Sequence, residues 1–170
     1  FTMWYQSWKN TEGTSTGQLH YATSRDGIHW DKPQLNQETG SNLVQHPAVQ
    51  GFQCPGIILD PRDPDPSRRY KMLFYPLSIS FSPDGIGWTE PQKIEIPTHI
   101  GQGDGLTCLA GWDARIGKYV AYFRPQVARP EQLKDVEGKT VRLIGRSESE
   151  DLKDWSELKA VLVPDENDPP

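Results

Sequence analysis

The carboxylate best placed for chemistry in this 170-residue chain is Asp104. It lies in the glycine-rich run 101–105, just before the apolar segment 106–112, and glycine allows a backbone to approach a ligand closely. A carboxylate at such a strand entrance could act as a catalytic group. The alternative is a turn aspartate that caps glycine-rich backbone. Asp104 is therefore our candidate catalytic residue.

Three other side chains could bind a ligand. His46 belongs to the link Gln45-His46-Pro47 and could reach a substrate, although it could equally be an ordinary loop histidine. Arg124 follows an aromatic pair and could bind a sugar hydroxyl or a carboxylate, or form a structural ion pair. Trp8 stands beside the polar segment 9–17 and could face a cleft. We take all three as candidate substrate-binding residues.

A motif that begins Ser-x-Asp and ends in Trp occurs three times and indicates the elements that must position these groups. Serine and aspartate bond their own backbone, glycine supplies a positive φ, and the next residues favour strands, so the motif predicts a tight corner between strands. In the third copy Leu152 replaces the glycine, and we expect a different turn type there. The copies are 24–30, 82–88 and 149–155.

Segments with strand-like composition flank each corner, and a complete unit contains four of them. Four antiparallel strands form one blade of a β-propeller. We therefore expect an all-β chain, part of a five-bladed β-propeller, with a little under three blades: a partial one at about 1–40, a second at about 50–97 and a third at about 104–163. The predicted strands are 3–6, 18–23, 56–59, 70–75, 78–81, 106–112, 118–124 and 141–146.

Two features that suggest ligand binding are more simply structural. Trp30, Trp88 and Trp155 occupy the same place in the repeat, so we expect them to pack the blades rather than stack on sugars. The acidic, proline-rich segment 60–66 invites a calcium site, but its spacing is not that of an EF-hand loop. We expect a solvated connection between strands there. We expect no metal and no cofactor.

Charge and composition narrow the range of partners. The net charge is −5 and the basic residues are scattered, which argues against a nucleic-acid partner. No stretch approaches the roughly 18 apolar residues of a membrane span, so we expect no membrane partner.

A family resemblance is carried by the runs 3–5, 21–30, 41–44, 69–72, 82–88, 112–113, 117–124 and 145–149. They resemble the bacterial proteins described as glycosyl hydrolase family 32 N-terminal-like. These belong with the five-bladed propeller superfamily of invertases, levansucrases and arabinanases. The resemblance implies a carbohydrate substrate or ligand, a secreted or periplasmic location, and further blades of the same propeller for closure of the ring.

Glycoside chemistry at the axis of the ring is what this resemblance implies. Such chemistry needs two carboxyl groups about 5–5.5 Å apart for retention or about 6.5–9.5 Å for inversion. Gln53-Cys54-Pro55 resembles the Glu-Cys-Pro acid motif with Gln53 in place of the glutamate; in another alignment the aspartate of an Arg-Asp-Pro motif falls on Cys54. Either alignment removes a carboxylate. Gln53 is left as a substrate-binding candidate, and Asp104 as the counterpart of an acidic residue before Trp112.

Two functions follow as hypotheses. The first is a glycoside hydrolase-like propeller that acts on the glycosidic bonds of oligo- or polysaccharides, and Asp104 supports it. The second is a non-catalytic carbohydrate-binding or degenerate propeller, which Gln53 and Cys54 support. Function depends on the site and not on the fold.

Overall fold

The computed structural model describes residues 1–12, 14–35, 40–47, 53–100, 107–128 and 140–165. The described residues form antiparallel sheets and one short 3₁₀ helix, so the expected all-β class is confirmed. The chain divides into two compact units, Phe1–Lys93 and Ile94–Pro170. Within the described part, no helix is long and apolar enough to cross a membrane.

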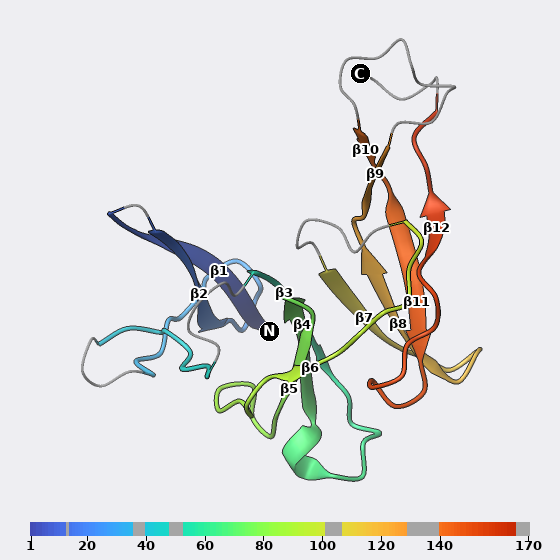
Figure 1. Ribbon diagram of the computed structural model, residues 1–170. Coiled ribbons are helices and arrows are strands. Elements are labelled where there is room, and N and C mark those ends of the chain that lie inside the picture. Colours follow the sequence, from blue (N-terminus) through green and yellow to red (C-terminus); the bar gives the residue numbers. More distant parts are fainter. Residues whose placement is uncertain (13, 36–39, 48–52, 101–106, 129–139, 166–170) are drawn as a thin grey trace. The chain divides into compact units, whose positions relative to one another are not determined.

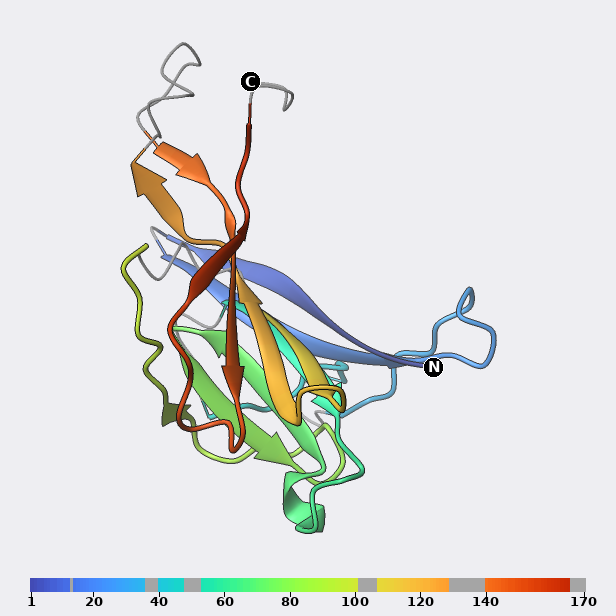
Figure 2. The same ribbon diagram turned by 90° about the vertical axis from the view of Figure 1, so that its right-hand side faces the viewer.

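The first unit begins with a long hairpin, β1 (Thr2–Thr11) and β2 (Thr14–Thr23), drawn in blue in Figures 1 and 2. Residues 41–44 run beside β2, because the N–H of Tyr21 donates to Asn42 O (3.0 Å) and the N–H of Val44 donates to Leu19 O (2.9 Å). Residues 41–44 therefore form a third, strand-like segment beside the two strands of the hairpin.

A four-stranded sheet completes the first unit. Its strands are adjacent in the order in which they follow along the chain, as in a blade: β3 (Gln53–Leu59), β4 (Tyr70–Tyr75), β5 (Ser78–Ser82) and β6 (Gln92–Lys93). The 3₁₀ helix η1 (Pro66–Arg68) lies in the connection between β3 and β4 (Figure 1).

The core of the first unit joins the hairpin to the sheet. Met72 and Phe74 of β4 are buried, as are Leu19 of β2 and Trp88. Full burial of one such side chain stabilises a fold by roughly 1.5–3 kcal/mol. Trp4 of β1 packs against the same cluster. The alternation of side chains along β1 and β2 thus leaves one face of the hairpin for polar groups.

The second unit contains another four-stranded sheet in sequential order: β7 (Thr107–Asp113), β8 (Lys118–Phe123), β11 (Ile144–Ser149) and β12 (Lys159–Leu162). A small ribbon of β9 (Gln126–Ala128) and β10 (Thr140–Arg142) continues past the ends of β8 and β11 (Figures 1 and 2). The single strand predicted over 141–146 is thus divided between two sheets.

The third copy of the repeated corner has the geometry of the other two. Leu152 has φ +68°, close to the +78° of Gly85. Ser149 Oγ accepts the N–H of Leu152 at 2.8 Å, as Ser82 Oγ accepts that of Gly85 at 2.8 Å. Our expectation of a different turn type was wrong, because the serine and Asp151 bond the backbone strongly enough to hold a leucine in the left-handed region.

The acidic connection 60–66 is not merely solvated. Lys71 of β4 is fully buried, and its ammonium group donates to Asp63 Oδ2 (2.9 Å) and Arg68 O (2.8 Å). Asp60 Oδ2 lies 3.4 Å from the same nitrogen. Burial raises the pKa of Asp63, but the bond from Lys71 and other bonds outweigh it, so the pKa falls below its usual value. Asp60 and Asp63 therefore compensate the charge of the buried Lys71.

Candidate functional site

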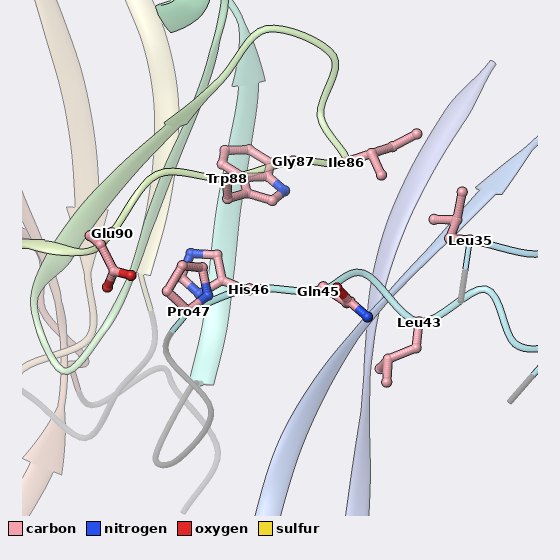
Figure 3. Close-up of a pocket in the computed structure, with 9 residues that line it drawn as sticks. All are labelled: Leu35, Leu43, Gln45, His46, Pro47, Ile86, Gly87, Trp88 and Glu90. Atoms are coloured by element: carbon pink, nitrogen blue, oxygen red, sulfur yellow. The ribbon is translucent and has the colours of Figure 1, made fainter. Parts of the chain in front are cut away.

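A pocket of about 560 Å³ opens in the first unit between residues 43–47, together with Leu35, and residues 86–90 at the end of the second corner. Figure 3 shows Trp88 and His46 next to each other, with Glu90 to one side and leucine and isoleucine side chains to the other. The pocket thus joins an apolar wall to a few polar groups, as small-ligand sites do. Its lining residues are Leu35, Leu43, Gln45, His46, Pro47, Ile86, Gly87, Trp88 and Glu90.

His46 is held in a partly buried, aromatic environment. Its Nε2 lies 3.1 Å from Ser80 Oγ, and its ring meets the Phe74 ring edge-on at 5.2 Å between centroids. Burial lowers the pKa of His46 to about 4. The imidazole is therefore neutral near pH 7. Its Nε2 is engaged by Ser80 Oγ, so His46 lines the pocket as a neutral polar ring held in place by a hydrogen bond.

Trp88 owes its orientation to the repeated corner. Its indole N–H donates to the carbonyl of Gly85 at 3.1 Å, which fixes the ring against the turn that precedes it. The side chain is only 8% exposed. Trp88 therefore packs the unit, as expected from the repeat, and also forms a wall of the pocket.

None of the other described candidates is among the residues that line this pocket. Asp104 lies outside the described residues. Gln53 is half-buried at the start of β3, opposite Tyr75, and is not among the lining residues. Trp8 is 47% exposed on β1, opposite Gly17. Arg124 is half-buried just after β8 and belongs to the second unit. Of the described candidates, His46 is the one that lines the pocket.

The second unit has a pocket of its own, of about 460 Å³, which sequence reasoning did not find. Trp112, Tyr122 and Arg146 line it together with Asp113 and Arg115. Asp113 accepts two bonds from Arg115, at 2.9 Å from Nε and 2.6 Å from Nη2. These bonds lower the pKa of Asp113 to about 2, so its carboxylate is ionised at neutral pH.

The pocket in the second unit depends on an irregular strand. The register of β7 with β8 shifts between Leu109 and Gly111, which marks a bulge, and the φ of Gly111 is +108°. Bulges redirect side chains, here those of Trp112 and Asp113. The glycine before Trp112 was the one local signal of this bulge, because glycine inside a strand pattern often marks such a place.

Comparisons with known proteins found similarity in structure but no match in sequence. No family model matches the chain, and no curated protein matches it. Among solved structures, an N-acetylgalactosamine deacetylase from F. plautii in complex with blood group B trisaccharide matches 96% of this chain and 50% of its own, at 14% identity and a TM-score of 0.64. A glycosyl hydrolase from Bacteroides ovatus matches 96% of this chain and 48% of its own, at 18% identity and a TM-score of 0.48.

The chain thus spans about half the length of these two proteins. The similarity to the deacetylase establishes a shared fold across nearly the whole chain. Both structural neighbours are carbohydrate-processing enzymes. Identity this low does not establish the family 32 resemblance, which stays a prediction together with closure into a five-bladed ring.

Proposed function

We propose that this chain is part of a carbohydrate-active propeller that hydrolyses glycosidic bonds in oligo- or polysaccharides. The observation that supports this most is its fold similarity, over 96% of the chain, to an enzyme whose crystal structure contains a trisaccharide. In this proposal the two four-stranded sheets are blades at about 50–97 and 104–163, the hairpin belongs to a partial blade at about 1–40, and further blades close the ring.

The pocket of the first unit is the proposed sugar subsite. Its volume of about 560 Å³ lies within the usual range of small-ligand sites, about 300–1,000 Å³. The apolar side chains and the Trp88 edge would contact the carbon face of a sugar. Gln45 and Glu90 would exchange hydrogen bonds with its hydroxyls, each contributing about 0.5–1.5 kcal/mol, and the His46 ring would form part of the wall.

Asp104 is the proposed catalytic carboxylate. The reaction also requires a second carboxyl group beside it. The alternative function, carbohydrate binding without catalysis, is favoured by Gln53, because an amide cannot supply a proton as a general acid. The two functions differ in whether bound glycans are cleaved, which makes them separable by experiment.

The test uses the complete protein and a panel of oligosaccharides, with products identified by mass spectrometry. We expect shortened glycans from the wild type, and a rate lower by about 10²–10⁴-fold in Asp104→Asn. Asp31→Asn is the matched control, because Asp31 is exposed, and it should keep the wild-type rate.

Three results would overturn the hydrolase proposal. Equal rates in the two variants would remove Asp104 from the reaction. Binding of a glycan without cleavage would favour the non-catalytic function. Release of acetate with an intact sugar chain would point to deacylation instead.

A further inference from the structure

Ser7 and His20 lie on the polar face of the β1–β2 hairpin, and Asn42, from the residues that run beside β2, continues their chain of hydrogen bonds. Ser7 Oγ is 2.8 Å from His20 Nε2, and His20 Nδ1 is 3.2 Å from Asn42 Oδ1. All three side chains are half-buried. A nucleophile bonded to a base, and that base bonded to an orienting group, is the arrangement that activates a hydroxyl.

The surrounding hydrogen bonds fix which nitrogen of His20 carries its proton. The amide nitrogen of Asn42 donates to the carbonyl of Tyr21 at 2.7 Å and to the hydroxyl of Tyr5 at 2.8 Å. A carbonyl can only accept, so the amide oxygen of Asn42 must be the atom that faces His20. His20 Nδ1 therefore carries the hydrogen. Its Nε2 lone pair faces Ser7, and the Ser7 hydroxyl donates to it.

Neighbouring residues hold this orientation. Tyr5 lies directly opposite His20 in the hairpin, and the two rings stack at 5.1 Å with an angle of 18° between their planes. Asn42 is anchored through both its side chain and its backbone, because its carbonyl accepts the N–H of Tyr21 at 3.0 Å. The imidazole is thus held on one side by a ring and at one end by an amide.

A side chain that could donate a hydrogen bond to a developing negative charge also lies opposite Ser7. Gln18 is the direct cross-strand partner of Ser7, so both side chains rise from the same face of the hairpin. Directly opposed residues have Cβ atoms about 4.5–5.5 Å apart. The carboxamide of Gln18 can therefore donate an N–H to an oxygen bound at Ser7, as glutamine side chains do in oxyanion holes.

From this constellation we propose that Ser7 is an activated nucleophile for acyl transfer, and that the hairpin face hydrolyses esters with a small acyl group. Ser7 Oγ attacks the acyl carbon while its proton passes to His20 Nε2. Collapse of the tetrahedral intermediate breaks the ester bond, and His20 returns the proton to the leaving alcohol. Water then attacks the acyl-serine with His20 as base, which releases the acid and restores Ser7. Asn42 acts as a positioning residue.

The experiment uses the full chain, a fluorophosphonate probe that phosphonylates activated serines, and p-nitrophenyl acetate. We expect labelling at Ser7, located by peptide mass spectrometry, and slow release of p-nitrophenol. Ser7→Ala should abolish both signals. Ser15→Ala is the matched control: Ser15 lies on the same hairpin and bonds Asn10 instead of a histidine, so both signals should persist. Equal melting temperatures would show that Ser7→Ala is folded.

The role of Asn42 has its own readout. Asn42→Ala should slow labelling at least tenfold. The ¹⁵N shifts of His20 should change from an Nδ1-protonated ring in the wild type to a mixture of tautomers in the variant. A folded wild type that the probe does not label, or labelling that persists in Ser7→Ala, would overturn the proposal. Neither outcome touches the glycosidase proposal, which rests on the fold similarity and is tested at Asp104.

Discussion

The indole N–H of Trp4 donates a 2.7 Å hydrogen bond to the backbone carbonyl of Gly85, 81 positions further along the chain. The indole of Trp88 donates to the same oxygen at 3.1 Å. A carbonyl oxygen has two lone pairs, so it can accept both bonds. One carbonyl in the second corner thus joins the first hairpin, the corner itself and the wall of the pocket.

Gly85→Ala should destabilise the first unit severely. Its φ of +78° disfavours any side chain, and a Cβ at this position would overlap the Trp4 ring. We expect a loss of about 3 kcal/mol or more in the free energy of unfolding, measured with urea and tryptophan fluorescence. Gly27→Ala has the same φ, but its Cβ would meet the Phe1 ring at an ordinary 3.7 Å, so about 1 kcal/mol is expected. Equal losses would contradict the role of Trp4.

Replacing Lys71 with methionine should cost about 3–5 kcal/mol, because it leaves Asp63 and Asp60 without the buried cation that they face. Adding Asp63→Asn to this variant should recover part of the loss. The exposed Lys153→Met is the control and should change stability by less than about 0.5 kcal/mol. Chemical denaturation measures all three, and a stable Lys71→Met would refute the ion-pair interpretation.

His46 should make stability depend on pH. Its pKa is about 4 in the folded chain and 6.5 for an ordinary histidine. As pH falls from 6.5 toward 4, the unfolded chain binds the proton and the folded chain does not, so stability decreases through this window. Allowing for the solvent that still reaches the ring, we expect a loss of about 1–2 kcal/mol between pH 7 and pH 5.

His46→Gln is the variant that isolates this effect, since glutamine can still bond Ser80 but does not titrate. Its free energy of unfolding should fall less than that of the wild type between the same two pH values. An identical decrease in both proteins would assign the effect to other groups.

Substitutions at the rim of the pocket should weaken glycan binding without disturbing the fold. Gln45 and Glu90 are both exposed, so Gln45→Ala and Glu90→Gln should leave the melting temperature unchanged. Each should raise the dissociation constant about 3–10-fold, which corresponds to the loss of one hydrogen bond. Titration calorimetry with an oligosaccharide that the protein cleaves or binds measures this constant. Gln92→Ala, an exposed change on β6 outside the lining residues, should bind as the wild type does.

Leu152→Gly should destabilise the second unit even though glycine suits the turn. The leucine is 1% exposed, and loss of a buried leucine side chain costs about 2–5 kcal/mol. Relief of its left-handed backbone returns only about 1–2 kcal/mol. We expect a net loss of about 2 kcal/mol by urea denaturation; a stabilised variant would show that the strain outweighs the packing.

Local patterns predicted much of the fold. The strand expected over 70–75 is β4, and the strand expected over 118–124 is one residue longer than β8. The corners were predictable because serine and aspartate act on backbone groups within three residues. The break at Leu143 was not, since its N–H bonds the carbonyl of Pro125, a partner that no local pattern identifies.

The site was less predictable, for a physical reason. His46 lines its pocket because it contacts Ser80 and Phe74, which are distant from it in the sequence. Lys71 is the one charged residue of β4, and a lysine is normally expected at the surface, yet it is buried. The line of Ser7, His20 and Asn42 needs both the register of the hairpin and the path of residues 41–44. Such contacts are products of tertiary packing, and sequence spacing does not encode them directly.

The three corners share one form, but each has become fitted to its own surroundings. The second copy has no room for a side chain at its fourth position because Trp4 occupies it, whereas the third copy needs the leucine that it buries there. The copies are therefore no longer interchangeable modules. A chimera that moved 149–155 into the place of 82–88 would carry a correct turn into the wrong neighbourhood. The three copies share the bend, but each fits only the side chains that surround it.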